Sequence, residues 1–477
     1  MLFNSSQFAV FLPIVLFLYW FVTNKSLRWQ NLLLLFSSYY FYSCWDWRFL
    51  FLLVFSTVLD YYTGLKIHRS ESDGSKKAWL YTSVIINLGF LGLFKYYNFF
   101  AESFADFVSA FGFRPSVATI NVILPVGISF YTFHGLSYVF DIYHKRIEPR
   151  TDFVNYSLFV SFFPLLVAGP IERATHLLPQ MEKPRQFNKE QAIGGIQMMI
   201  WGFFKKVVVA DSLAPVVNNI FHNYETYSGA TLAYGAFLFA IQIYGDFSGY
   251  TDIALGTAKL FNFELLTNFR FPYFSRDIAE FWRRWHISLS SWFRDYVYIP
   301  LGGSKSGKAK AIRNTFIIFL VSGFWHGANW TFVAWGGIHA LLFIPLLITG
   351  SNRKNMGEVG GSGFFPSIKE LFQILITFCL VTIAWIFFRA PDIASASAYI
   401  ARMFTDLLSP VNSRVLYSFD LAMIALLIAY DYYLLKRHNV KAMPKLALTV
   451  IHIFLLLIVL GSFLENKFSS QFIYFQF

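Results

Sequence analysis

The sequence predicts an all-α, polytopic membrane protein, and three observations support that class. Hydrophobic residues make up 56% of the 477 residues, aromatic residues 21% and charged residues only 14%. The apolar residues form long continuous runs, whereas the strands of a membrane barrel alternate in segments of about ten residues. The Lys and Arg residues, which give a net charge of +12, lie mainly in short segments between these runs, where such residues set membrane orientation. Membrane lipids, and not nucleic acid, are therefore the expected partners of the basic residues.

A helix needs roughly 20 apolar residues to cross a bilayer, and most of the apolar runs are close to this length. About eleven full crossings are expected, together with half-helices, and the sequence predicts one integral-membrane domain over residues 1–477. A run that contains Pro164 and reaches Gly169-Pro170 is interrupted. Broken helices are tolerated only where they are buried in protein or line a cavity, so we expect a central tunnel. The candidate spans and half-spans are 7–23, 30–44, 47–64, 78–97, 118–140, 153–169, 192–210, 230–250, 312–328, 330–349, 369–388, 416–435 and 446–463.

Basic segments predict the orientation, because Lys and Arg accumulate in cytoplasmic loops. If these basic segments lie in the cytoplasm, the order of the spans places both termini on the outer side of the membrane. The segments expected in the cytoplasm are Lys25 with Arg28, Lys66 to Lys77, His144 to Arg150, Lys305 to Arg313, Arg353 with Lys354, and Lys436 to Lys445.

Two histidines are the strongest chemical signal. His286 lies in the polar segment 281–304 and His326 in the polar segment 322–330, and both segments are surrounded by apolar sequence. Ionisable groups at membrane depth tend to mark function, and an imidazole can take a proton from an attacking hydroxyl. The alternative for His326 is a buried histidine whose hydrogen bond goes to a backbone carbonyl. No metal site is expected, because the sequence has no His-Glu-x-x-His motif and no paired cysteines.

Residues beside the histidines are further candidates for the site. At helical spacing, Trp282 and His286 are predicted to share one face of a helix. Arg283, Arg284 and Arg294 either bind a phosphate, which matches guanidinium geometry, or anchor lipid headgroups. Trp325 is expected to wall a slot beside His326.

The segment 242–256 carries Asp246, Ser248 and Asp252 around a predicted helix break. Three roles are open for the carboxylates: they order a tunnel wall, they orient a histidine, or they form structural pairs with nearby arginines. Ser248 does not fit a nucleophile elbow of the form Gly-x-Ser-x-Gly, because the glycines stand at 245 and 249.

Several stretches together resemble the membrane-bound O-acyltransferase superfamily, and within it the bacterial branch of alginate O-acetyltransferase membrane subunits and teichoic-acid D-alanyl transferases. The resemblance covers roughly the whole chain and is most specific in its central part. It rests on residues 125–143, 162–174, 242–256, 268–303 and 324–340.

The resemblance implies a helical bundle around a tunnel in the bacterial inner membrane. It assigns His326 the role of the superfamily's essential histidine and His286 that of its partner, with Asn329 as a further donor-binding or tunnel candidate. No permanently bound cofactor is implied, and acetyl-CoA is the expected acyl donor. A periplasmic or surface partner of the SGNH type would complete transfer to a polysaccharide.

Alternatives remain at two levels. The acceptor is alginate-like, or it is peptidoglycan, cellulose or a teichoic acid that receives D-alanine. A protein of another class, a transporter of lipid-linked sugars, is disfavoured by the lack of an internal repeat and by the two histidines. The aromatic tail, residues 472–477, is either an interfacial belt or an acyl relay through the Tyr474 phenol.

Overall fold

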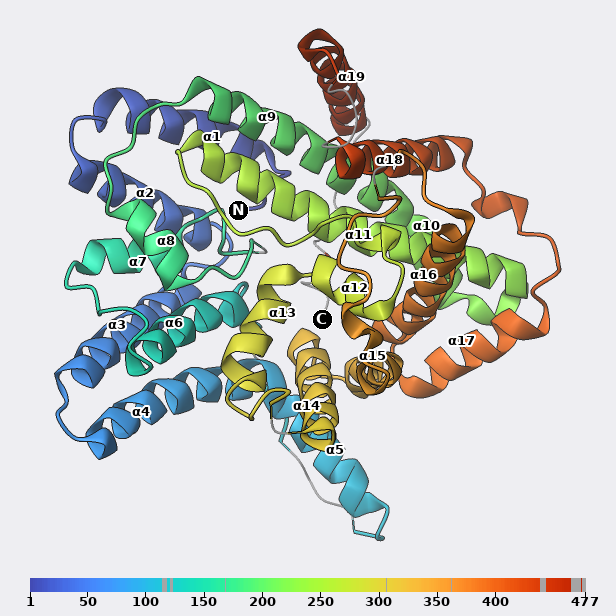
Figure 1. Cartoon of the computed structure of the whole chain (residues 1–477), viewed down its shortest axis with the longest axis horizontal. Coiled ribbons are helices and arrows are strands. Elements are labelled where there is room, and N and C mark those ends of the chain that lie inside the picture. The colour runs from blue at the N-terminus through green and yellow to red at the C-terminus, as the bar shows by residue number, and fades with distance from the viewer. Residues whose placement is uncertain are drawn as a thin grey trace. The chain divides into compact units, whose positions relative to one another are not determined.

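The computed structural model describes residues 1–477 except 114–117, 121–122, 168, 306, 362, 438–442, 465–472 and 474–477. The described residues are helices and connecting segments without a β-strand, so the predicted all-α class is confirmed. They form two compact units, whose helices are labelled in Figure 1: unit 1 is Met1–Met199 with Ile253–Leu266, and unit 2 is Ile200–Asp252 with Thr267–Phe477. The expectation of one domain over the whole chain stays a prediction.

Unit 1 consists of the N-terminal helices and the end of α11. Three of its helices, α3, α4 and α6, pack on one another, and Asp60 of α3 is buried there, accepting hydrogen bonds from Ser83 (2.6 Å) and Asn87 (2.8 Å). The helices are α1 Ser6–Phe17, η1 Leu18–Val22, α2 Leu27–Ser43, α3 Arg48–Arg69, α4 Asp73–Leu91, η2 Gly92–Tyr96, α5 Tyr97–Ser109, α6 Ile128–Tyr143, α7 Phe153–Ser161, α8 Ala174–Met181 and α9 Lys189–Phe203, which continues into unit 2.

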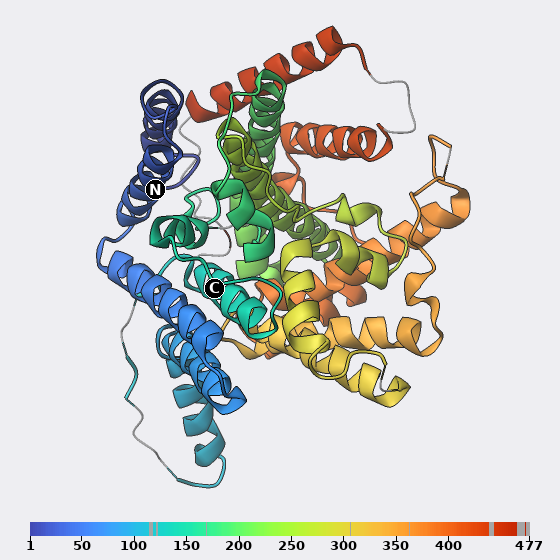
Figure 2. The ribbon, with the colours of Figure 1, turned by 60° about the vertical axis from the view of Figure 1, so that its left-hand side comes forward.

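Unit 2 holds most of the longest helix, α11, and the C-terminal part of the chain; its last two helices are the orange-red and red ribbons of Figure 2. Its elements are η3 Phe204–Ala210, α10 Asp211–His222, η4 Tyr224–Thr226, α11 Gly229–Leu260, η5 Pro272–Phe274, α12 Ile278–Arg284, α13 Ile287–Phe293, η6 Arg294–Tyr298, α14 Lys308–His326, α15 Trp330–Ile348, η7 Ser351–Arg353, α16 Ile368–Arg389, α17 Ile393–Thr405, η8 Ser413–Val415, α18 Ser418–Lys436 and α19 Lys445–Leu464.

Seven described helical stretches are long and apolar enough to cross a membrane. The apolar runs of the sequence predict about eleven crossings, which is more than these seven. Several of the predicted spans form shorter helices: α2 has 17 residues and α7 only nine. The seven stretches are Arg48–Arg69, Asp73–Ser109, Lys189–His222, Trp330–Ile348, Ile368–Arg389, Ser418–Lys436 and Lys445–Leu464.

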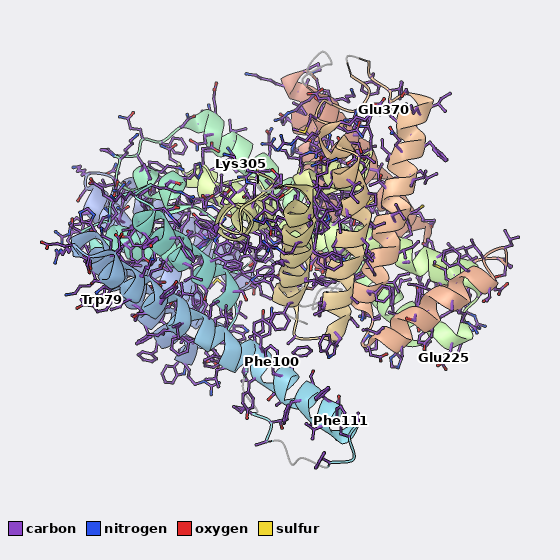
Figure 3. All side chains as sticks on the ribbon, turned by 60° about the horizontal axis from the view of Figure 1, so that its bottom comes forward. Trp79, Phe100, Phe111, Glu225, Lys305 and Glu370 are labelled. Atoms are coloured by element: carbon purple, nitrogen blue, oxygen red, sulfur yellow. The ribbon has the colours of Figure 1, made fainter. Side chains whose placement is uncertain are left out.

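The stretch Asp73–Ser109 joins α4, η2 and α5 into 37 residues. At 1.5 Å per residue its length is about 55 Å, which exceeds the roughly 30 Å hydrocarbon core. No residue of α5 is buried. Phe100 on α5 and Phe111 just after it, labelled in Figure 3, are 57% and 66% exposed. The second half of this stretch therefore contributes an exposed aromatic surface and not core packing.

The segment around Ser248 differs from its prediction. We expected a helix break there, but α11 runs unbroken from Gly229 to Leu260. Gly249 instead allows close packing: a Cβ at this position would lie 2.7 Å from the carbonyl oxygen of Gly202 and 2.8 Å from the amide nitrogen of Lys206. Gly249 thus allows two helical segments to pack closely. From the sequence alone, this glycine was interpreted as a helix break.

Candidate functional site

The two histidines singled out in the sequence lie together inside unit 2. Their ring centroids are 6.2 Å apart and the rings are inclined by 58°. His326 is the last residue of α14, and His286 is the residue directly before α13. Both side chains are buried, at 3% and 0% exposure. Segments separated by forty positions therefore build one site.

A close crossing of α14 and α15 places His326 against the second helix. A Cβ on Gly323 would lie 2.2 Å from the carbonyl oxygen of Phe332, and a Cβ on Gly336 would lie 2.2 Å from that of Phe319. Real Cβ atoms are essentially never closer than 3.0 Å to such an atom. Only glycine at both positions permits this contact, and it holds the C-terminal end of α14 beside α15.

Aromatic rings enclose His326 on several sides. The ring centroids of Trp325, Trp335 and Phe388 lie 4.9, 5.2 and 5.4 Å from that of the imidazole. All three rings are close to perpendicular to the imidazole, at 74°, 90° and 70°. Perpendicular contacts of this kind are favourable for aromatic pairs, and they exclude bulk water from the imidazole. Trp325 thus packs beside His326, and its role as the wall of a slot stays a prediction.

His286 is a neutral imidazole in an apolar environment. The ring of Phe247 lies 4.8 Å away and that of Trp325 lies 5.9 Å away, measured between centroids. Burial lowers the pKa of His286 to about 3, because no charge nearby compensates the loss of water around an imidazolium. Within the part of the chain that the structure describes, neither ring nitrogen has a hydrogen-bond partner. A neutral imidazole carries one donor and one acceptor, and the described protein groups use neither of them in His286.

The backbone at His286 corrects the helical prediction. α12 ends at Arg284, and His286 has φ 44° and ψ 53°, in the left-handed region. The chain therefore turns between α12 and α13, and Trp282 and His286 do not share one helical face. A non-glycine residue in this region costs on the order of 1–3 kcal/mol and persists only where its surroundings hold it in place.

A third histidine, His339, is not among the residues selected from the sequence. It contacts the Trp335 ring, which also contacts His326. The Trp282 indole donates a hydrogen bond to Nδ1 of His339 over 3.3 Å. Because an indole is only a donor, we assign His339 as the neutral tautomer with its proton on Nε2. The Trp335 ring lies 4.9 Å from His339 and 5.2 Å from His326. Only the spacing of Trp335 and His339, four residues apart on one helix, hinted at this arrangement.

The carboxylates of α11 form buried ion pairs with lysines, not with arginines as one reading expected. Lys206 lies between Asp211 (2.7 Å) and Asp246 (2.6 Å), and Lys205 pairs with Asp252 (2.5 Å). Both lysines belong to η3, a π-helical segment. The pairs therefore fix η3 against α11 in unit 2.

Of two other candidates, Asn329 has structural partners and Ser248 is buried. Asn329 caps α15: its side chain accepts a hydrogen bond from the Thr331 amide (2.9 Å) and donates one to the Pro391 carbonyl (2.8 Å). Ser248 is buried on α11 at 1% exposure. Their roles in donor binding or in a tunnel stay predictions.

Arg283 and Arg284 of the 281–304 segment are held by protein groups. Arg283 donates to the carbonyl oxygens of Asn352 and Asn355, each at 2.8 Å. Arg284 donates to the Glu280 carboxylate at 2.7 Å. Arg283 thus ties the segment after α15 to α12, and binding of a phosphate by either residue stays a prediction.

Tyr474 lies outside the described residues. The described residue before it, Ile473, is buried at 3% exposure. Its amide donates a hydrogen bond to Asp246 over 2.6 Å. The carboxylate that pairs with Lys206 therefore also contacts the C-terminal segment of the chain.

Comparison with known proteins agrees with this architecture. A family model described as "MBOAT, membrane-bound O-acyltransferase family" matches residues 144–356. "Probable alginate O-acetylase AlgI" of Pseudomonas aeruginosa is 38% identical over 407 residues, which cover 85% of this chain and 75% of that protein. "Peptidoglycan O-acetyltransferase" of Helicobacter pylori is 35% identical over 427 residues, with 83% and 78% coverage. "Teichoic acid D-alanyltransferase" of Bacillus subtilis is 29% identical over 238 residues, with 46% and 58% coverage.

The helical fold is that of a multi-pass membrane protein, and unit 2 contains a buried pair of imidazoles. The chain belongs to the membrane-bound O-acyltransferase family, and it is an acyltransferase.

Proposed function

We propose that this acyltransferase moves an acetyl group from cytoplasmic acetyl-CoA across the membrane for O-acetylation of an alginate-like polysaccharide. The observation that carries the proposal is the pair of buried imidazoles whose centroids lie 6.2 Å apart, in a chain that is 38% identical to proteins named as alginate O-acetylases. The two imidazoles are close enough to act on one acyl group. A tunnel with its donor mouth near residues 283–313 would join the cytoplasm to the outside.

In this mechanism His326 is the general base and His286 its partner. His326 accepts the proton of the attacking hydroxyl as its oxygen bonds to the thioester carbonyl. His286, which is neutral, donates a hydrogen bond to the oxyanion that forms. The carbon–sulfur bond then breaks, and the proton passes from His326 to the CoA thiolate. One oxyanion donor typically contributes about 10²–10³ in rate, whereas loss of the base removes the reaction path.

Replacement of His326 tests the proposal. His326→Ala should abolish O-acetylation, measured by mass analysis of cell polysaccharides, while the protein remains at its normal level in the membrane. His222→Ala is the matched control, since His222 is an exposed imidazole of the same unit, and it should leave acetylation unchanged. Normal acetyl content with His326→Ala would contradict the mechanism. His286→Ala should retain a small residual rate.

The tail extends the proposal by one step. The Tyr474 phenol would attack acetyl-CoA, give up its proton through His326 to the leaving thiolate and carry the acetyl group as an ester. A second transfer would pass it to the acceptor hydroxyl, with the proton returning to the phenolate oxygen. Two easier steps would thus replace a difficult one. The contact of Ile473 with Asp246 supports an anchored tail. Tyr474→Phe, which removes only the hydroxyl, should stop transfer; full transfer would leave the interfacial belt as the explanation.

Location and partner follow from the same proposal. The chain would lie in the bacterial inner membrane with both termini outside, as its basic segments predict. A periplasmic or surface partner of the SGNH type would complete transfer to the polysaccharide. Acetyl-CoA labelling from the cytoplasmic face should load the enzyme, and labelling from the outer face alone would contradict this orientation.

Peptidoglycan is the second candidate acceptor, because a relative named peptidoglycan O-acetyltransferase is 35% identical over 83% of this chain. Mass analysis of both glycans, with and without the protein, distinguishes the two. Loss of acetyl groups from peptidoglycan alone would reject the alginate-like acceptor.

A further inference from the structure

The turn at His286 is held by a residue far from it in sequence. The backbone carbonyl of Asn268 accepts a hydrogen bond from the Ile287 amide at 2.9 Å. Its side-chain oxygen accepts one from the Ser288 hydroxyl at 2.5 Å and one from the Ser288 amide at 3.4 Å. Asn268 and Ser288 are both buried, at 0% and 1% exposure. One asparagine thus accepts three hydrogen bonds from the two residues that follow His286.

These contacts replace an ordinary helix cap. The first amides of a helix have no partner within the helix and are usually satisfied by the side chain of the residue before it. That residue is His286 for α13, and its side chain makes no such hydrogen bond. Asn268 accepts hydrogen bonds from the first two amides of α13, those of Ile287 and Ser288. The imidazole of His286 is consequently not engaged in capping.

A second contact on the other side of the turn fixes the same geometry. The Arg270 amide donates to the Arg284 carbonyl over 3.0 Å. Segment 268–270 therefore spans the chain reversal from the end of α12 to the start of α13. A histidine in the left-handed region needs such restraint, because this conformation is unfavourable for residues other than glycine.

We propose that Asn268 is a positioning residue, which caps α13 in place of His286 and thereby directs the His286 imidazole toward His326. This inference rests on the proposed function of His286 in acyl transfer. Asn268 itself does not touch substrate in this scheme. Its contribution is to keep the left-handed turn while leaving both ring nitrogens of His286 for chemistry.

Substitutions at Asn268 and Ser288 test the role. Asn268→Ala removes two of the three hydrogen bonds and should lower the rate of acetyl transfer about 10–100-fold, as a displacement near 1 Å does for a catalytic group. Asn268→Asp keeps an oxygen at the accepting position, and we expect it to restore most of the rate. Ser288→Ala removes only the hydroxyl contact and should cost a few-fold. Equal rates for wild type and Asn268→Ala would overturn the inference.

A double-mutant cycle separates positioning from simple stabilisation. The cycle uses full-length protein in native membranes. Asn268→Ala should cause no further loss of rate when His286→Ala is already present, because the effects of substitutions at two coupled residues do not add. Additive losses would overturn the inference. If Asn268→Ala does not accumulate in the membrane, Ser288→Ala takes its place in the double-mutant cycle with His286→Ala. Wild-type turnover by His286→Ala would overturn the proposed role of that histidine together with this inference. An inactive His286→Ala with a fully active Asn268→Ala would overturn this inference alone.

Discussion

Gly336→Ala is the change that tests most directly how the fold positions His326. The new Cβ would lie 2.2 Å from the Phe319 carbonyl oxygen, so α14 and α15 must move apart by 0.8 Å to reach the 3.0 Å at which such contacts begin. Overpacking of this kind typically costs about 1–3 kcal/mol. A displacement near 1 Å of a catalytic group costs about 10²-fold in rate. We therefore expect acetyl transfer to fall roughly 10–100-fold.

The neighbouring glycine is the matched control. A Cβ on Gly337 meets only the Leu320 side chain, at 3.8 Å, which is ordinary contact. Gly337→Ala should keep the wild-type rate and gain roughly 0.5–1 kcal/mol from its higher helix propensity. The assay is the acetyl content of the polysaccharide, normalised to the protein level in the membrane, with the midpoint of thermal unfolding in detergent. A normal rate for Gly336→Ala, or equal losses for both variants, would refute the argument that the close crossing positions His326.

Two further predictions concern stability. His286→Gly should unfold at a higher temperature than His286→Ala, by the equivalent of about 1 kcal/mol, because glycine tolerates a positive φ; equal midpoints would mean that the turn is not strained. His176, which is 37% exposed, hydrogen-bonds Glu172 over 2.8 Å, and this contact raises its pKa. Its stabilisation is complete below the unfolded pKa of about 6.5 and is lost as pH rises through the higher folded pKa. Thermal midpoints from pH 6 to 8 should fall slightly more in wild type than in His176→Gln; parallel curves would contradict this.

The sequence was sufficient for the fold class, and it pointed to two histidines that lie side by side in the structure. Apolar runs of membrane length are a property of composition, and a buried polar residue is visible against them. The conformation at His286 was not predictable in this way. Residues 278–293 have a helical pattern. The break in that pattern depends on hydrogen bonds that Asn268 accepts, and Asn268 stands 18 positions upstream of His286 in a segment without periodicity. The unbroken course of α11 was missed for a related reason, since Gly249 serves a tertiary contact.

Buried ion pairs explain how α11 serves the site without touching the reacting atoms. Such pairs contribute little net stability, because desolvation offsets their attraction. They do restrict geometry: Lys206, which also pairs with Asp211, binds Asp246 at 2.6 Å and so holds the register of η3 against α11. Phe247, the residue after Asp246, places its ring 4.8 Å from His286. A slip of that register would remove one wall of the imidazole site, so we infer that Asp246 acts on the chemistry through the position of Phe247.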